Sequence, residues 1–460
     1  MGASRKFDAI IIGGGQAGPT LAGRLTDAGR KVALVERKHL GGTCVNTGCT
    51  PTKALVASAY AAHLARRSGD FGVTIGDDIS VDMKQVHERA AGIALKSRSG
   101  LEKWLAGMQN LTLIRGHARF VGPHAVEVDG EALTAPLIFI NVGGRAKRPD
   151  MPGTDSVRLL DNTDMVALDT VPRHLVVIGG SYIGLEFAQM FRRFGAEVTV
   201  VEKASRLISR EDAEISDAVR DILEREGIAI RLDAECIDFA PAGDGIRVGL
   251  HCEKEPRAVV GSHVLLAVGR RPNTDDLGLD IAGIARDERG YIEVDDRLST
   301  NVEGVFALGD CNGRGAFTHT AYNDFEIVAA NLLDGGDRRV SDRVPGYALY
   351  IDPPLGRAGL SEREARKKGL EILVGSRPMT RVSRAVEKGE TLGLMKVVAD
   401  AGTGKILGAS ILGPGGDEAI HGILDAINWG TPYRDVQWAV PIHPTVSELI
   451  PTVIGGMKPG

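Results

Sequence analysis

Two stretches of this 460-residue chain share the same order of a buried strand, a glycine-rich turn, a helix and a second strand that ends in an acid. The first begins with the apolar strand 9–12, which Gly13, Gly15 and Gly18 follow. These glycines allow a tight turn, a close approach of the backbone to a pyrophosphate, and close packing of helix on strand. The next strand ends at Glu36, whose carboxylate can accept hydrogen bonds from ribose hydroxyls. The pattern predicts a dinucleotide site with the phosphates at the amino end of the helix.

The second copy predicts a second nucleotide site on the same chain. Its strand 174–178 leads to Gly179 and Gly184, and its acid is Glu202. The corresponding glycines and acid of the first copy all lie 166 positions earlier, which indicates an internal repeat of one folding unit. Ser181 stands where the middle glycine belongs, and its Cβ limits how closely a phosphate can approach. We therefore expect weaker binding of the dinucleotide at this site, which suits a cofactor that binds and leaves.

A pair of cysteines, Cys44 and Cys49, lies just ahead of an alanine-rich segment. A helix is predicted from Thr50 and Pro51, because proline is tolerated in a first turn. Cys49 would then lie at the positive end of the helix dipole, which favours a thiolate, and Lys53 adds a positive charge one turn later. The spacing allows a disulfide that two electrons would open into one thiol and one thiolate. This is a redox signature; two unrelated buried cysteines are the alternative.

Composition narrows the classes of function. The net charge of -5 is mild and no basic run exists, so nucleic acid is not an expected partner. No run of ~18 apolar residues exists, so no membrane span is expected, and residues 1–6 are too short for a signal-peptide core. An odd count of five cysteines in a long chain argues for a reducing compartment, and we expect a cytoplasmic protein.

Two nucleotide sites and a redox cysteine pair form an electron path. Nicotinamide gives two electrons as a hydride, and a flavin can accept them and pass them to a disulfide. Here the sequence resembles the class I flavoprotein disulfide reductases, the family of dihydrolipoamide dehydrogenase, glutathione reductase and mercuric reductase. The resemblance covers essentially the whole chain in the family's order. It rests on the two glycine fingerprints and on the segments 41–53, 267–273, 304–310 and 443–448.

The resemblance implies a role for each residue along this path. Cys44 matches the interchange thiol that attacks substrate, and Cys49 matches the flavin-proximal thiol. Lys53 matches the lysine near flavin N5, and Glu186 matches its carboxylate partner beneath the nicotinamide. Tyr182 matches the position that gates the nicotinamide pocket in members similar to glutathione reductase.

The resemblance also supplies an acid–base pair and a flavin ligand. His443 and Glu448 match the pair that is donated across a dimer interface to the other subunit's cysteines, and disulfide exchange needs a base that titrates in this range. An ordinary core or surface histidine is the alternative. Asp310 matches the aspartate on the ribityl chain, with a helix N-cap as the alternative. The other positions implied at the two cofactors are Thr43, Ala118, Gly143, Gly269, Thr318 and Ala321, and no metal site is expected.

These motifs predict an α/β protein with two Rossmann-like dinucleotide-binding domains, one for FAD and one for NAD(P), and a C-terminal α+β dimerisation domain. We expect the first FAD segment at residues 1–147, the NAD(P) domain at 148–287, the second FAD segment at 288–340 and the dimerisation domain at 341–460.

The expected function is an NAD(P)H-dependent, FAD-containing disulfide reductase that acts on a small disulfide or a lipoyl group. Glu202 favours NADH, because a carboxylate accepts from the ribose 2′-hydroxyl and repels a 2′-phosphate. Lys203 and Arg206 lie close by and leave NADPH open. His319 resembles the pattern of dihydrolipoamide dehydrogenases, which favours a lipoyl substrate.

Two alternatives stay open: a mercuric-reductase-like metal or oxidant-defence reductase, and a flavin-bound redox sensor that does not turn over. Cys311 occurs in some mercuric reductases, and a small buried hydrophobe is its structural interpretation. Cys236 and Cys252 fall in the predicted NAD(P) domain. The segment 454–460 carries no vicinal cysteine pair, which favours small disulfides over mercuric ion.

Overall fold

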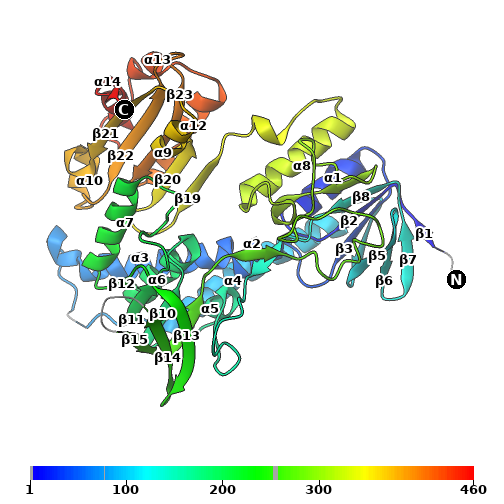
Figure 1. The fold of residues 1–460 in the computed structure, drawn as a ribbon, viewed down its shortest axis with the longest axis horizontal. Helices are drawn as coiled ribbons and strands as arrows, with labels where there is room; N and C mark the ends of the chain where they lie inside the picture. The colour runs from blue at the N-terminus through cyan, green and yellow to red at the C-terminus, as the bar shows by residue number, and fades with distance from the viewer. Residues whose placement is uncertain (1–3, 77, 252–256) are drawn as a thin grey trace. The chain divides into compact units, whose positions relative to one another are not determined.

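The computed structural model describes residues 4–76, 78–251 and 257–460 (Figure 1). Cys252 and the side chain of Cys236 lie outside this described part. The chain divides into two compact units, each assembled from separate stretches of sequence. The first comprises Met1–Ala54, His87–Lys147 and Gly269–Arg343, and the second comprises Leu55–Val86, Arg148–Val268 and Val344–Gly460.

The first unit is built on a five-stranded parallel sheet. Its strand order is β18-β8-β2-β3-β4, so the first strand of the sequence repeat, β2, lies in the middle. A central strand is covered on both faces, and β2 is accordingly apolar and fully buried. The strands are β2 (Ala9–Ile12), β3 (Val32–Glu36), β4 (Leu111–Arg115), β8 (Leu137–Ile140) and β18 (Val305–Ala307).

Alternate residues of β2 pack into two different cores. Ala9 and Ile11 pack with the helices α1 (Ala17–Asp27) and α8 (Thr318–Leu333), which lie on one face of the sheet (Figure 1). Ile10 and Ile12 pack against a second sheet of order β1-β7-β6-β5. The strands of that sheet are β1 (Arg5–Lys6), β5 (Ala118–Gly122), β6 (Ala125–Val128) and β7 (Glu131–Thr134). A short antiparallel pair, β9 (Gly144–Ala146) and β17 (Arg270–Pro272), completes the strands of this unit.

The second unit repeats the parallel design and adds another domain. Its four-stranded parallel sheet has the order β12-β11-β10-β16. The strands are β10 (His174–Ile178), β11 (Glu197–Val201), β12 (Ala229–Arg231) and β16 (His263–Leu266). The helix α6 (Tyr182–Phe194) joins β10 to β11, and α7 (Ala213–Arg225) joins β11 to β12. One core lies between this sheet and the antiparallel strands β13 (Glu235–Ala242), β14 (Gly245–His251) and β15 (Ala258–Gly261).

The C-terminal part of the second unit is a six-stranded antiparallel sheet packed against helices. Its order is β19-β20-β23-β22-β21-β24. The strands are β19 (Gly346–Leu349), β20 (Leu355–Gly359), β21 (Ile372–Pro378), β22 (Leu394–Asp400), β23 (Ile406–Leu412) and β24 (Lys458–Pro459). The helices of this part are α9 (Glu362–Lys367), α10 (Ser383–Glu387), α11 (Gly416–Ala419), α12 (His421–Asn428), α13 (Tyr433–Gln437) and α14 (Ile450–Gly455). The predicted fold class is confirmed.

Two consecutive helices carry the cysteine pair. The predicted helix after the pair is α3 (Cys49–Arg66), and it begins at Cys49 itself. A second helix, α2 (Gly42–Thr47), was not expected and carries Cys44. The other helices are α4 (Met83–Ala106) and α5 (Asn162–Val166).

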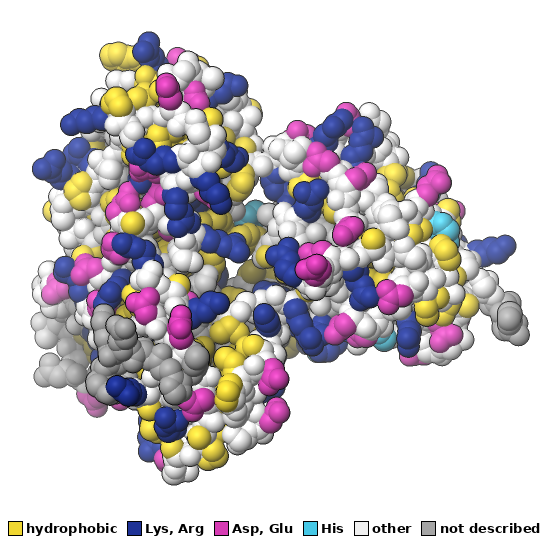
Figure 2. Space-filling model, viewed as in Figure 1, with side chains coloured by type: hydrophobic (Ala, Val, Ile, Leu, Met, Phe, Trp, Pro, Cys, Tyr) yellow, Lys and Arg dark blue, Asp and Glu magenta, His cyan; other side chains and the backbone are white. Residues whose placement is uncertain are grey.

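The surface carries interspersed charges of both signs. On the face shown in Figure 2, Lys and Arg side chains alternate with Asp and Glu side chains. Many pair at the surface, as Arg24 does with Asp334 at 2.7 Å, and such exposed pairs add little stability. In the described part of the chain, no helix combines the length and the hydropathy that a membrane crossing requires.

Candidate active site

The first glycine turn has the geometry of a dinucleotide cradle. Gly13 has φ +107°, a conformation that side chains disfavour, and a Cβ on Gly18 would lie 2.3 Å from the carbonyl oxygen of Gly13. The Glu36 carboxylate accepts hydrogen bonds from the amides of Gly14 at 2.7 Å and Lys38 at 2.6 Å. The turn is therefore held by the acid at the end of the next strand. A side-chain-free turn at the amino end of α1 fits the pyrophosphate of FAD.

The second turn repeats these contacts at the same offset of the sequence. Gly179 has φ +115°, and a Cβ on Gly184 would lie 2.1 Å from the Gly179 oxygen. The Glu202 carboxylate accepts from the amides of Gly180 at 2.6 Å and Ala204 at 2.8 Å. Both glycine turns are thus fixed by the same pair of bonds. Ser181 is the N-cap residue of α6 and is exposed; its effect on phosphate binding stays a prediction.

The two cysteines have opposite acidities. Both are free thiols in the structure, so the predicted disulfide of the oxidised protein stays a prediction. Cys49 Sγ lies 3.3 Å from Thr318 Oγ1. The contact with Cys44 lowers the pKa of Cys49 to about 6, and Thr318 and the charge of Lys53 act in the same direction. The contact with Cys49 and burial raise the pKa of Cys44 far above its usual range. The pair is therefore arranged as one thiol and one thiolate.

Asp310 follows strand β18 in a turn that other residues hold. It lies within a short 3-10 helix, Gly309–Asn312, whose N-cap is Leu308, so Asp310 is not the cap. The Gly309 amide donates to the buried Asp324 carboxylate at 2.8 Å, and Arg270 Nε lies 3.6 Å from Asp310. Burial raises the pKa of Asp310, and Arg270 opposes this.

The other positions implied at the two cofactors belong to the first unit. Thr318 and Ala321 lie in the first turn of α8, and a Cβ on Gly309 would lie 3.2 Å from that of Ala321. Thr43 is exposed on α2, whereas Ala118 is buried at the start of β5, where only its backbone could face a ligand. Gly143 and Gly269 have φ +62° and +108°.

Cys311 belongs to the core. It is fully buried, and its Sγ–H donates to the carbonyl oxygens of Ile140 at 3.4 Å and Leu308 at 3.2 Å. Burial raises its pKa to about 12. These contacts support the structural interpretation of this residue, not a role in metal relay.

Tyr182 and Glu186 lie on α6 in the second unit. Glu186 is buried, and its Oε1 accepts a hydrogen bond from the Tyr350 amide at 3.0 Å. The Tyr182 ring meets the Tyr347 ring edge-on at 5.2 Å between centroids. Lys53 belongs to the first unit, so its pairing with Glu186 stays a prediction.

His443 is oriented by the predicted carboxylate. Its Nδ1 lies 2.8 Å from Glu448 Oε2, which leaves Nε2 to face outward. The His443 side chain is 75% exposed and that of Glu448 only 14%. The segment before it carries the exposed apolar side chains of Trp438, Val440 and Ile442.

Comparisons with known proteins agree with this geometry. A family model described as pyridine nucleotide-disulphide oxidoreductase matches residues 7–324, and the model of that family's dimerisation domain matches residues 346–454. The chain belongs to the pyridine nucleotide-disulphide oxidoreductase family. It is therefore an FAD-dependent enzyme that uses NAD(P)H, and its dimerisation domain indicates a homodimer. The predictions of family, enzyme class and cofactors are confirmed.

Similar proteins carry several names within this family. A probable pyridine nucleotide-disulfide oxidoreductase RclA of Escherichia coli is 36% identical over 454 residues, 97% of this chain and 98% of RclA. A dihydrolipoyl dehydrogenase of Thermus scotoductus is 35% identical, covering 96% of each chain. A mercuric reductase of Bacillus cereus is 32% identical, covering 96% of this chain and 70% of that relative. The solved structure of the HOCl-induced flavoprotein disulfide reductase RclA from Escherichia coli matches with a TM-score of 0.89 at 34% identity, over 97% of this chain and 99% of that chain.

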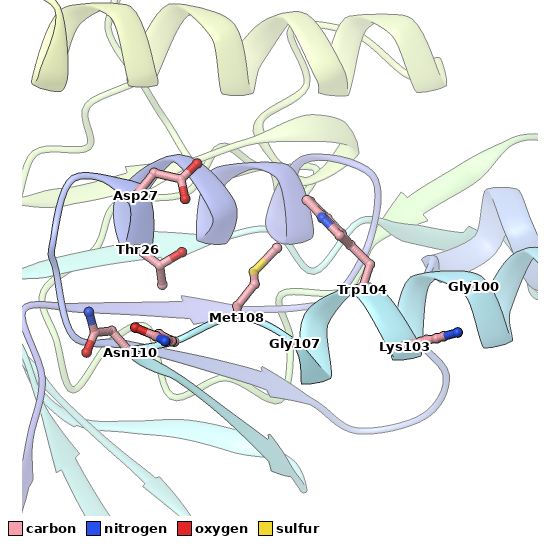
Figure 3. Close-up of a pocket in the computed structure, with 9 residues that line it drawn as sticks. Thr26, Asp27, Gly100, Lys103, Trp104, Gly107, Met108 and Asn110 are labelled. Atoms are coloured by element: carbon pink, nitrogen blue, oxygen red, sulfur yellow. The ribbon is translucent and has the colours of Figure 1, made fainter.

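A hollow in the first unit lies away from the first glycine turn. It measures about 810 Å³ and is lined by residues at the carboxyl ends of α1 and α4, among them Thr26, Asp27 and Trp104 (Figure 3). The glycine turn lies at the opposite end of α1, and an 11-residue helix is roughly 16 Å long. The hollow is therefore remote from the phosphate-binding end.

Sequence reasoning missed three residues that position the site. Asn141 donates its side-chain amide to the Gly13 oxygen at 3.1 Å, and Asp324 and Arg270 hold the Asp310 turn. Asn141 and Asp324 have no local motif, and the motif 267–273 that contains Arg270 gives no sign of its contact with Asp310. Only the strand ends offered a signal, because ligands bind at the carboxyl ends of parallel strands and Asn141 directly follows β8.

The acidity of Cys49 gives a pH prediction. In the two-electron-reduced holoenzyme, the long-wavelength thiolate-to-flavin absorption band should be present at pH 8 and disappear as the pH falls through about 6, because the thiolate gains a proton. Cys49→Ser should abolish the band, and Cys44→Ser should leave it. Thr318→Val should move the midpoint to higher pH, since Thr318 lowers the Cys49 pKa. Spectra across a pH series check this; a band intact in Cys49→Ser would contradict the assignment.

The second turn gives a prediction of cofactor preference. We expect a higher kcat/KM with NADH than with NADPH, because Glu202 directly follows β11, as the acid does in sites that bind a free 2′-hydroxyl. Arg206 pairs with Asp217 and donates to the Ala213 oxygen, so it is engaged elsewhere. Asp217→Ala should free this guanidinium and reduce the preference. Steady-state kinetics with both nucleotides decide the matter, and a preference for NADPH in the unaltered protein is the contrary result.

Proposed function

We propose that the protein is an NADH-dependent reductase of small disulfides or lipoyl groups, with Cys44 and Cys49 as its exchanging pair. The observation that carries the proposal is the unequal acidity of the two thiols, with the thiolate at the amino end of α3. FAD, when bound, supplies the transfer of two electrons from nicotinamide to sulfur.

The cysteines then complete a balanced exchange. Cys44 gives its proton to His443 and attacks one sulfur of the substrate, which breaks the substrate S–S bond and forms a mixed disulfide. The Cys49 thiolate attacks the Cys44 sulfur, which releases the second substrate sulfur and closes the Cys44–Cys49 bond. His443 returns the proton to a leaving thiolate. The substrate disulfide gains two electrons and leaves as one thiol and one thiolate, and the thiolate takes its proton from solvent.

In this proposal, His443 of one subunit exchanges protons with the cysteines of the other subunit. Its exposed ring, with Nδ1 held by Glu448, is suited to accept a proton at Nε2 from outside its own unit. The exposed run of Trp438, Val440 and Ile442 beside it is the kind of apolar surface that a partner covers. The thiol pair needs a reducing compartment, which favours the cytoplasm.

Oxidant or metal defence is the second candidate. The name of the relative RclA describes an HOCl-induced reductase, and solved structures of that protein include a Cu(II) complex. Thiolates are suitable ligands for soft metal ions, so Cys44 and Cys49 could hold such an ion. The buried Cys311 is not available as a third thiol. A redox sensor without turnover is the third candidate.

A panel of substrates tests which of the three candidate functions is correct. The purified holoenzyme is mixed with NADH and, in turn, lipoamide, small disulfides, mercuric thiolates and Cu(II), and NADH oxidation is followed by absorbance. We expect the fastest sustained oxidation with a disulfide or lipoamide. Faster turnover with mercuric ion or Cu(II) would favour metal defence, and flavin reduction without turnover on any substrate would favour the sensor.

His443 gives a prediction for the half-reactions. His443→Gln should slow thiol exchange by ~10²-fold or more and leave flavin reduction by NADH nearly unchanged, because general acid–base catalysis typically contributes that much. Rapid mixing separates the two steps. His421→Gln changes an exposed histidine of the same domain and serves as the matched control.

Subunit mixing tests the shared site. Chains with Cys44→Ser and chains with His443→Gln should regain part of the activity when they form heterodimers, because one site of each heterodimer then has both groups. Absence of recovery despite demonstrated subunit exchange would mean that each site is made within one chain.

A further inference from the structure

A loop of residues 207–214, here called the brace loop, is bonded to the second glycine turn. The Ile208 amide donates to the Gly180 carbonyl oxygen at 2.8 Å. The side chain of Leu207 covers the same glycine, since a Cβ on Gly180 would lie 2.6 Å from Leu207 Cδ2. The brace loop thus contacts the turn that is expected to bind the nicotinamide nucleotide, through one hydrogen bond and one apolar side chain.

The brace loop has a disfavoured backbone at the point of contact. Ile208 has φ +39°, which is rare for a β-branched residue. Such a conformation persists only where the surroundings fix it. The carbonyl oxygen of Ile208 accepts a hydrogen bond from the Glu211 amide at 2.8 Å, and the side chains of Glu211 and Asp212 bind the C-terminal domain.

Glu211 makes the first of these contacts. Its side chain is fully buried, and it accepts a hydrogen bond from the Tyr347 hydroxyl. Arg357 Nε lies 3.6 Å from the carboxylate, and Ser410 Oγ lies 3.5 Å from it. All three partners belong to β19, β20 and β23 of the antiparallel sheet.

Asp212 makes the second contact. The Asp212 carboxylate accepts hydrogen bonds from the backbone amides of Glu362 at 3.1 Å and Arg363 at 3.0 Å. These are the first two residues of α9. Lys396, only 2% exposed, lies 3.0 Å from the same carboxylate. Two adjacent acids therefore bind the loop to the C-terminal domain.

Tyr347 also touches the nucleotide-binding helix directly. Its ring meets the ring of Tyr182 edge-on at 5.2 Å and 72°. Tyr182 is the first residue of α6, next to the glycine turn, where the helix end approaches the phosphates of a bound dinucleotide. One tyrosine of the C-terminal domain thus contacts both the helix and, through Glu211, the brace loop.

We propose that Tyr347 is a positioning residue for the nicotinamide nucleotide, because its ring fixes the orientation of Tyr182 at the second glycine turn. The proposal rests on the proposed function in that NADH binds at this turn. A ring held in one orientation loses less freedom when the nucleotide binds, and so affinity rises. The C-terminal domain then supports nucleotide binding as well as dimerisation.

The test measures binding of NAD⁺ to the oxidised holoenzyme by calorimetry. Tyr347→Ala should raise the Kd about two- to tenfold, the factor that an edge contact between aromatic rings contributes. Tyr347→Phe keeps the ring and should restore affinity to within about twofold. The kcat at saturating NADH should stay nearly unchanged. Tyr433→Ala removes a ring elsewhere in the same domain and is the matched control; Tyr347→Leu replaces Tyr347→Ala if the latter fails to retain FAD.

A double-mutant cycle separates positioning from a general effect on structure. In a Tyr182→Ala background, Tyr347→Ala should change the Kd by less than about twofold, because the ring it positions is gone. An equal loss in both backgrounds, or equal losses for Tyr347→Ala and Tyr347→Phe, would overturn the proposal. If Tyr182→Ala alone leaves NAD⁺ binding unchanged, the proposal also fails. Absence of any NADH-driven flavin reduction in the unaltered protein would instead refute the proposed function.

Discussion

The bond between the carboxylate that ends or follows a strand and a glycine amide is the constraint on which both glycine turns depend. Glu36 fixes Gly14, and Glu202 fixes Gly180, with each acid also accepting from the backbone two residues beyond itself. A glycine turn without side chains would otherwise have many conformations. Charged acceptors make strong hydrogen bonds, so each turn is held in one conformation without a bound phosphate.

The environment gives the same residue type opposite chemistry in this chain. Cys49 begins a helix beside Thr318 and Lys53, and it is a thiolate near neutral pH. Cys311 lies in the core, where its thiol donates to two carbonyl oxygens, and burial keeps it a thiol. Position on a helix dipole and access to water, not the residue type, decide which cysteine can react.

Local patterns in the sequence were enough to predict the parts that are local in the fold. The fingerprint glycines, Glu36 and Glu202 lie within short stretches whose spacing is set by a strand, a turn and a helix. The pairing of His443 with Glu448 also spans only five positions. By contrast, Asn141 reaches Gly13 across 128 positions, and Tyr347 reaches Glu211 across 136. Such contacts follow from how sheets and domains pack, and a single sequence carries no periodic signal for them.

The short helix that carries Cys44 was missed for a different reason, since its turn begins with two glycines that disfavour a helix.

The C-terminal domain carries groups that belong to the proposed active site and groups that contact the domain of the second glycine turn. It carries His443, whose exposed ring and apolar neighbours suit a site completed by a second subunit. Its antiparallel sheet also carries Arg357 and Lys396, two nearly fully buried cations that meet acids of the brace loop. Removing one partner from such a buried pair is costly, because it leaves an uncompensated charge. These bonds therefore join the domain that forms the dimer to the domain that binds the nicotinamide nucleotide. The brace loop thus contacts the antiparallel sheet through Glu211 and Asp212, and the second glycine turn through Ile208.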